Sequence, residues 1–278
     1  RKKTFTVWFH VSNACNLSCK YCYIPNIHKD ATKGFFSNQI ISIRTAKSAI
    51  NKLFDYCLEE GFETLQLKFA GGEPLLAKEV LDVACSHALY LSNRTGISLS
   101  YRIVTNGVIL DDHIIDLLTK YKFGISISLD GGKYSHDKIR FIATNDNNVR
   151  GGKKVTRNGT WNTIVKNIDS LIAYGVKPYI LCTVTLDNHN SLAELVAFCS
   201  AKGIGVRFSL VRDKKISTDL RAQEQILETM RSIYVYLGDH FPVSMPIERF
   251  ARFAEWNMHK KKLKACGVCE SMLCIDNG

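Results

Sequence analysis

The sequence predicts an α/β fold, a partial (β/α)6 barrel, and three observations support this prediction. The 278 residues comprise 46% hydrophobic and 23% charged residues, which is typical of a globular protein with a sizeable core. Short segments rich in β-branched and aromatic residues alternate with longer amphipathic segments, as in parallel sheets with helical crossovers. Six such units are too few for a closed eight-stranded barrel, so an open, partial barrel fits the count.

The predicted strands are short runs between polar or glycine-containing segments. They cover residues 5–11, 64–70, 97–105, 124–130, 177–186 and 205–211. The predicted helices have apolar residues at helical spacing, and we expect Asp111 to cap the third of them. They cover residues 37–60, 78–93, 111–121, 161–174, 191–202 and 218–239.

The loops that follow the first four strands carry the unusual sequence motifs. In parallel α/β proteins, the loops at the carboxyl ends of the strands meet at one edge of the sheet, where ligands bind. We therefore expect these loops to form a single site. They are the cysteine-rich segment 13–23, GGEP at 71–74, TNG at 105–107 and LDGG at 129–132.

The segment 131–160 after the fourth strand is predicted to be a long polar loop. Its second half contains a run of basic residues, Arg150, Lys153, Lys154 and Arg157. A solvated loop tip is the simpler interpretation of this run. The alternative is an electrostatic docking site for an acidic partner.

Three of the ten cysteines crowd one loop, in the sequence NACNLSCKYCY. Cys15, Cys19 and Cys22 follow the spacing C-x3-C-x2-C. A structural zinc site takes four protein ligands, whereas a [4Fe–4S] cube normally takes one thiolate on each iron. Three thiolates would leave one iron open to a substrate or cofactor. The alternative is a zinc site that His10 or His28 completes.

The remaining cysteines separate into two kinds. Four are scattered through apolar segments, where we expect them to be small core residues. They are Cys57, Cys85, Cys182 and Cys199. Three others gather near the end of the chain, and this clustering favours metal binding in a reducing compartment, the cytoplasm, over a disulfide framework.

The first cysteine loop resembles the motif of the radical S-adenosylmethionine (radical SAM) enzymes, in which an aromatic residue, here Tyr21, precedes the third cysteine. The resemblance extends over residues 5–211, because GGEP follows the second strand as it does in that family. SLDG at 128–131, followed by HDKIR at 136–140, resembles the branch that modifies peptides and proteins. Members of that branch often carry a C-terminal SPASM or twitch domain with further iron–sulfur clusters.

The resemblance implies a [4Fe–4S] cluster and S-adenosylmethionine (SAM) as cofactors, with Cys15, Cys19 and Cys22 as cluster ligands. SAM would bind the open iron, and its reductive cleavage would give a 5′-deoxyadenosyl radical that abstracts hydrogen from the substrate. No residue is identified as a catalytic base. The residues implied in SAM binding are Tyr21, Tyr23, Gly71, Gly72, Glu73, Pro74, Asn106, Ser128 and Arg140.

Within this set, GGEP would line the methionine amino group, the tyrosines the adenine, Ser128 the ribose and Arg140 the methionine carboxylate. Simpler interpretations stay open. GGEP alone could be a turn with Pro at a helix start, Asn106 a turn residue, and Tyr23 a packing residue. His136 and Asp137 could simply cap or brace their loop.

The last cysteines lie in ACGVCESMLCIDNG, which resembles the opening of a SPASM or twitch domain with IDNG as a hairpin turn. The resemblance implies that Cys266, Cys269 and Cys274 bind an auxiliary [4Fe–4S] cluster; free thiols or a zinc site are the alternatives. We expect three parts, and we expect the natural protein to extend beyond both ends of this chain. The parts are a radical SAM partial barrel at 1–212, a helical connector at 213–264, and a truncated SPASM/twitch-like auxiliary cluster region at 265–278.

The resemblance favours an enzyme that modifies a ribosomally made precursor peptide, forming a cross-link, with a flavodoxin- or ferredoxin-like electron donor. One alternative is an anaerobic sulfatase-maturing enzyme, although Ala70 replaces the Gln that commonly precedes GGEP there. Another is the GTP cyclase of molybdenum-cofactor biosynthesis, whose corresponding region lacks HD-x-x-R. An iron–sulfur electron carrier is the non-enzymatic alternative.

The charge balance leaves several partner classes open. The formal net charge is +11 and the pI about 9.1, so acidic peptides, nucleotides or RNA are electrostatically possible partners. No RNA-binding motif is recognisable in the sequence, and nucleic acid is not expected as a partner. No apolar run reaches the roughly 18 residues that a membrane span requires, so a membrane is not expected either.

Overall fold

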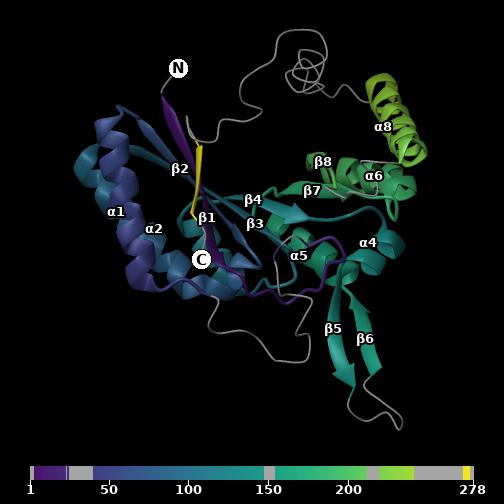
Figure 1. The fold of residues 1–278 in the computed structure, drawn as a ribbon, viewed down its shortest axis with the longest axis horizontal. Coiled ribbons are helices and arrows are strands. Elements are labelled where there is room, and N and C mark those ends of the chain that lie inside the picture. The colour runs from purple at the N-terminus through teal and green to yellow at the C-terminus, as the bar shows by residue number, and fades with distance from the viewer. Residues whose placement is uncertain are drawn as a thin grey trace.

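The computed structural model describes residues 3–22, 24, 40–146, 154–211, 219–240 and 272–275. Its centre is a sheet of seven parallel strands. Figure 1 shows the helices on the outer side of this sheet. This arrangement confirms the predicted partial barrel. In order across the sheet, the strands are β8 (Val206–Leu210), β7 (Tyr179–Val184), β4 (Gly124–Ser128), β3 (Ser98–Thr105), β2 (Thr64–Gly71), β1 (Thr4–Ser12) and β9 (Met272–Ile275).

The helices lie between successive strands, and all except α4 contribute residues to the core on the apolar face of the sheet. They are α1 (Ile43–Glu59), α2 (Lys78–Thr95), α3 (Asp112–Lys120), α4 (Lys133–Ile139), α5 (Trp161–Ala173), α6 (Leu192–Lys202) and α8 (Leu220–His240), with short 3-10 helices η2 (Pro74–Ala77) and η3 (His189–Ser191). The predicted cap of α3 is confirmed, because Asp111 accepts a 2.8 Å hydrogen bond from the backbone of Ile114. Among the described residues, no helix is both long enough and apolar enough to cross a membrane.

Two predicted boundaries were wrong. The first helix begins at Ile43 rather than at residue 37, because Ser42 caps it by accepting from Thr45. The segment 131–160 is not a single loop, since it contains α4 and an antiparallel hairpin of β5 (Phe141–Asp146) and β6 (Lys154–Gly159). Figure 1 shows this hairpin projecting from the barrel.

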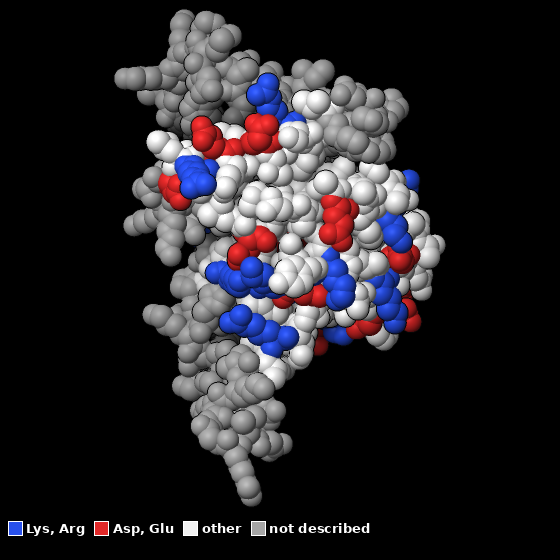
Figure 2. Space-filling view, turned by 90° about the vertical axis from the view of Figure 1, so that its right-hand side faces the viewer, with Lys and Arg blue, Asp and Glu red and all other residues white. Residues whose placement is uncertain are grey.

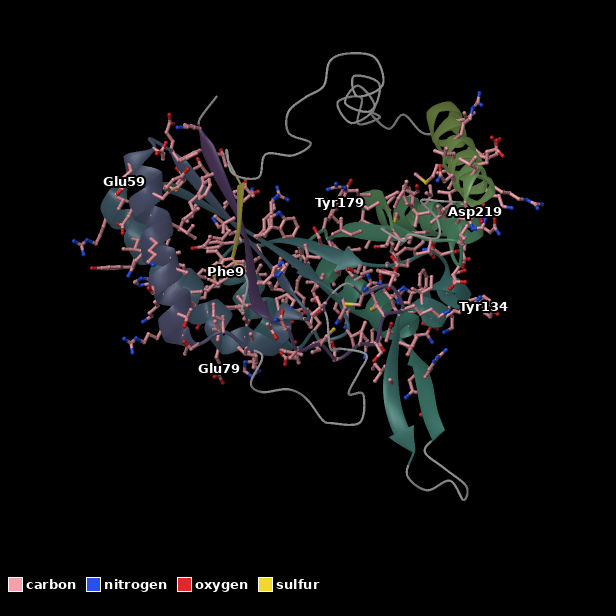
Figure 3. All side chains as sticks on the ribbon, viewed as in Figure 1. Phe9, Glu59, Glu79, Tyr134, Tyr179 and Asp219 are labelled. Carbon is pink, nitrogen blue, oxygen red and sulfur yellow. The ribbon has the colours of Figure 1, made fainter. Side chains whose placement is uncertain are left out.

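The core lies between the strands and the outer helices. Phe9, which Figure 3 labels, and Phe69 are fully buried, and their rings are 5.8 Å apart on neighbouring strands. The four scattered cysteines are also buried, with at most 2% exposure, so their predicted place in the core is confirmed. Alternate residues of the strands face away from this core, toward the inside of the partial barrel.

The terminal region is described only in part. Cys266, Cys269 and the IDNG residues 276–278 lie outside the described residues, whereas Cys274 belongs to β9, in register with Trp8 of β1. In the basic run, Arg150 and Lys153 also lie outside them, and Arg157 is exposed above the ring of Phe141. On the face that Figure 2 shows, the described basic and acidic side chains are interspersed and form no large patch of one sign.

Candidate active site

The cysteine loop leaves β1 and is fixed by the backbone at the end of β2. The amide of Gly72 donates to the carbonyl of Ser12 at 2.6 Å, and that of Glu73 donates to the carbonyl of Ala14 at 2.8 Å. Gly71 has φ +132°, and a Cβ at this position would overlap the carbonyl oxygen of Ser12. The glycines of GGEP are therefore required by the close approach of the cysteine loop itself.

The other side of the same loop is held by the segment after α4. The amide of Ser18 donates to the carbonyl of Phe141 at 2.9 Å, and that of Lys20 donates to Ile139 at 3.1 Å. The loop thus lies between the end of β2 and the base of the β5–β6 hairpin. Two parts of the chain that are distant in sequence therefore hold the cysteine loop in position.

The three predicted ligand thiols lie together on this loop, and two of them accept hydrogen bonds from nitrogen donors. Cys15 Sγ accepts from the amide of Leu17 at 3.4 Å and from the Asn106 side chain at 3.8 Å. Cys19 Sγ accepts from the Arg140 guanidinium at 3.7 Å. Donors of this kind stabilise thiolate ligands of iron–sulfur clusters, so the loop fits such a group.

Burial shapes the acidity of these thiols. It raises the pKa of Cys15 to about 12 and that of Cys19 to about 11. Both thiols therefore need a cation to hold them as thiolates, which a cluster iron would supply. Among the described residues, no three His, Cys, Asp or Glu side chains converge closely enough to hold a single metal ion.

Glu73 is fully buried and connects the second loop to the third. Its carboxylate accepts from the Thr105 hydroxyl at 2.8 Å, the Asn106 amide at 2.7 Å and the Leu75 amide at 3.0 Å. Burial raises the pKa of this carboxyl to about 7. Its predicted contact with the methionine amino group stays a prediction, and the structure adds a bracing function that sequence reasoning missed.

Asn106 is both a turn residue and a contact of the cysteine loop. Its side-chain oxygen accepts from the amide of Val108 at 3.0 Å, which closes the turn. Its side-chain nitrogen donates to the side-chain oxygen of Asn16 at 2.7 Å as well as to Cys15. Asn16 was not predicted, and the only sequence signal for it was its position beside the first cysteine.

A buried ion pair anchors the other side of the site. Arg140 donates from Nε to Asp130 at 2.6 Å and from Nη2 to the Tyr21 hydroxyl at 2.5 Å, and that hydroxyl donates to Asp130. Asp130 is fully buried and also accepts from the amide of Thr183 at 2.8 Å. Arg140 therefore contacts Asp130, Tyr21 and Cys19. Sequence reasoning did not select Asp130, although it lies in the LDGG motif.

The remaining predicted residues are placed as follows. Ser128 ends β4 and is 9% exposed, two residues before Asp130. Pro74 begins η2 and is buried. Tyr23 lies outside the described residues.

His136 and Asp137 brace the site rather than facing it. The imidazole of His136 accepts from the amide of Asp130 at 3.1 Å and contacts the Thr160 hydroxyl at 2.9 Å. Asp137 accepts from the amides of Thr160 and Trp161, both at 2.8 Å, at the start of α5. The bracing interpretation of these residues is confirmed.

The comparisons with known proteins match this geometry. The model of the family described as the radical SAM superfamily matches residues 9–199, well over half of the chain. The chain belongs to the radical SAM superfamily. The cofactors of this radical SAM protein are therefore a [4Fe–4S] cluster and SAM. The assignment of the first-loop thiols as cluster ligands stays a prediction.

Curated relatives carry out several different chemistries. The chain is 30% identical over 130 residues to the radical SAM cyclopropyl synthase TigE of Paramaledivibacter caminithermalis, covering 45% of this chain and 27% of that protein. It is 26% identical over 192 residues to a cysteine-type anaerobic sulfatase-maturating enzyme of Clostridium novyi, covering 67% and 45%. It is 26% identical over 200 residues to the GTP 3′,8-cyclase of Corynebacterium glutamicum, covering 71% and 46%. The chain thus spans less than half the length of each.

A solved structure has the same fold. Native anSMEcpe with bound AdoMet and Cp18Cys peptide matches with a TM-score of 0.69 and 19% identity, covering 97% of this chain and 71% of that one. This likeness supports the arrangement of the partial barrel.

Replacing Gly71 by Ala tests the contact between the two loops. The new Cβ would overlap the Ser12 carbonyl, so the cysteine loop would be displaced. We expect less iron and sulfide per protein after anaerobic reconstitution and a lower melting temperature.

Gly61→Ala is the matched control, because Gly61 also has positive φ, +66°, but nothing lies within 4 Å of an added Cβ. It should lose only roughly 1–2 kcal/mol of stability and keep its iron content. Equal iron content in the two variants would contradict the argument.

The stability of the fold should depend on pH through His136. Burial lowers its pKa from 6.5 to about 4, so the unfolded chain binds its proton first as the solution is acidified. The contribution is complete above about pH 6.5 and is lost as the pH falls toward 4, by up to roughly 3 kcal/mol. The free energy of unfolding, measured with denaturant between pH 7 and about 4.5, should fall less with decreasing pH for His136→Gln than for the exposed control His113→Gln. An equal fall in the two variants would count against this assignment.

Proposed function

We propose that this chain contains the radical SAM domain of an enzyme that modifies a ribosomally made precursor peptide. The observation that carries the proposal is the loop of three thiols, fixed against GGEP at the carboxyl end of a parallel partial barrel. When bound, the cofactors supply reductive cleavage of SAM to a 5′-deoxyadenosyl radical, which abstracts a hydrogen atom from the substrate.

The residues of the chain hold and orient these cofactors. Cys15, Cys19 and Cys22 would hold the cluster through three thiolates, one fewer than the four that would close it to SAM. Arg140, fixed by buried Asp130, places a cation beside Cys19, where it can also meet the methionine carboxylate. Ser128, at the end of β4, is assigned to the ribose.

GGEP and the aromatic residues complete the SAM site in this proposal. The carbonyls and Glu73 of the GGEP segment would line the methionine amino group, and Asn106 lies on the Cys15 side of the loop. Tyr21 and Tyr23 are assigned to the adenine. An external flavodoxin- or ferredoxin-like protein supplies the electron, and no residue is assigned as a substrate base.

Two features support a peptide as substrate. The HDKIR segment, which resembles the peptide-modifying branch, braces the site through His136, Asp137 and Arg140. The solved relative anSMEcpe is described with a bound peptide. The oxidoreductase character, the cytoplasmic location and the SPASM/twitch branch belong to the same proposal.

An auxiliary [4Fe–4S] cluster bound by Cys266, Cys269 and Cys274 is also part of the proposal. Cys274 lies in β9, which pairs with β1 at the edge of the same sheet. This pairing places Cys274 beside the barrel and is consistent with an auxiliary site there. In this division of the chain, residues 1–212 form the radical SAM domain, 213–264 the connector and 265–278 the start of the auxiliary region.

A second candidate is a sulfatase-maturing enzyme, which the 26% identity to the Clostridium novyi protein favours. Ala70 in place of the usual Gln before GGEP argues against it. The GTP cyclase and the electron carrier are the remaining alternatives, and the following experiment separates all four.

Anaerobic co-expression with a short peptide encoded beside the gene tests the proposal. The peptide should lose two hydrogen atoms in the mass spectrum, without an aldehyde, because a cross-link replaces two bonds to hydrogen. The Cys19→Ala variant should leave the peptide unmodified, because the loop then lacks one of its three cluster ligands.

Reaction of the product with an aldehyde-specific hydrazide would instead indicate formylglycine. Turnover of GTP would indicate the cyclase, and a wild-type protein that forms no 5′-deoxyadenosine would indicate a carrier. A Cys57→Ala variant, altered at a buried cysteine in α1, should modify the peptide as the wild type does.

A further inference from the structure

A row of side chains crosses the inner face of the partial barrel. Trp8 of β1, Lys68 of β2, Arg102 of β3 and Gly124 of β4 are partners in register on four neighbouring strands. Residues in register on parallel strands share a face, and the residues beside them in sequence belong to the core under the helices. The row therefore lies on the face that the helices do not cover (Figure 1).

The contacts within this row place the two cations on either side of the β2–β3 pair, Lys68 toward β1 and Arg102 toward β4. The ammonium of Lys68 lies 5.4 Å from the centroid of the Trp8 ring. The guanidinium of Arg102 runs over Gly124, where an added Cβ would lie 3.3 Å from one of its nitrogens. Glycine at this position therefore leaves the room that the Arg102 side chain occupies.

A third cation acts on Lys68 from the far side of the sheet. Burial lowers the pKa of Lys68, and the charges of Arg102 and Arg207 lower it further. Arg207 belongs to β8, which β7, β4 and β3 separate from β2 in the order of strands. The curvature of the sheet thus brings Arg207 of β8 close enough for its charge to lower the pKa of Lys68 in β2.

This arrangement costs stability in the protein alone. Like charges directly opposite each other on neighbouring strands repel and destabilise a sheet. Among the ion pairs within the described part of the chain, none includes Lys68 or Arg102. An anion bound between them would relieve the repulsion.

We propose that Lys68 and Arg102, assisted by Arg207, form a subsite that binds a carboxylate side chain of the peptide substrate. This inference rests on the proposed function and names the chemistry of its substrate. Arg102 can hold a carboxylate through two parallel N–H···O bonds while Lys68 adds a point charge. Lys68 precedes Gly71 by three residues, roughly 10 Å of strand, so the acidic residue lies near the one that is modified.

A carboxylate matches this subsite better than the triphosphate of a nucleotide. Lys68 is half-buried, and the adjacent row on the same face is neutral, with the Gln66 amide donating to the Ser100 hydroxyl at 3.0 Å. A triphosphate carries several charges and would require further cations along this face. Two adjacent cations with a third across the barrel suit a single acidic side chain.

Binding of a fluorescein-labelled hexaglutamate peptide tests the proposal. The reconstituted protein with SAM is titrated anaerobically at about 0.15 M ionic strength, with fluorescence anisotropy as the readout. Lys68→Gln and Arg102→Gln should each weaken binding roughly tenfold or more, and Arg102→Lys should weaken it less. Hexaglutamine should not bind, and the exposed outer-helix control Lys166→Gln should bind hexaglutamate as the wild type does.

Thermal melting of the same variants separates a binding function from a structural one. If the cations serve the substrate, Lys68→Gln and Arg102→Gln should melt no lower than the wild type, because like-charge repulsion is removed. A clear loss of melting temperature together with unchanged affinity would overturn the proposal.

Unchanged affinity for hexaglutamate in both Gln variants would also overturn it. If both variants lose binding of GTP but keep the wild-type affinity for hexaglutamate, the cations bind a nucleotide and the proposal is wrong. Formation of 5′-deoxyadenosine by the wild-type protein is measured in parallel. Its absence would refute the proposed function, whereas the subsite is judged by peptide binding alone.

Discussion

The close approach of two backbones fixes the site: residues 12–14 at the end of β1 lie directly against residues 71–73 at the end of β2. The loop that carries the cysteines has no helix or strand of its own, so its shape depends on neighbours. Gly71 and Gly72 permit the approach because they carry no Cβ, and their segment donates two amide hydrogens to the loop. The base of the β5–β6 hairpin fixes the other side. The barrel thus acts as the rigid support on which three thiols are held in place.

Two buried carboxyl groups extend this support. Their burial costs desolvation free energy, and they serve to position other residues rather than to stabilise the fold. Glu73 holds the turn after β3, and through Asn106 that turn reaches Cys15. Asp130 holds Arg140, which reaches Cys19. The thiols of Cys15 and Cys19 are therefore each connected to the carboxyl end of a strand by a carboxylate and a nitrogen donor. The inner face below this edge is different, since Lys68 and Arg102 have no carboxylate partner among the ion pairs of the described residues.

Much of the fold could be predicted from the sequence, because each βα unit buries a regular apolar face. The cysteine spacing and GGEP likewise located the site. The hairpin could not be predicted, since FIATND and KVTRNG lack an alternating apolar pattern and are held by pairing with each other. The start of α1 depends on the Ser42 cap, which periodicity does not reveal. Asp130 and Asn16 were missed because their functions come from burial and from contacts between distant loops, which no local pattern encodes.

The central claim is that the first loop holds an iron–sulfur cube whose open iron binds SAM. Electron–nuclear double resonance of the reduced, reconstituted protein, with SAM labelled isotopically at its amino nitrogen and carboxylate oxygen, tests it most directly. The account predicts hyperfine coupling of both labelled atoms to the cluster, and loss of that coupling when unlabelled SAM is substituted. A cluster signal that shows no coupling to either label, or a loop that holds zinc in place of iron, would contradict it.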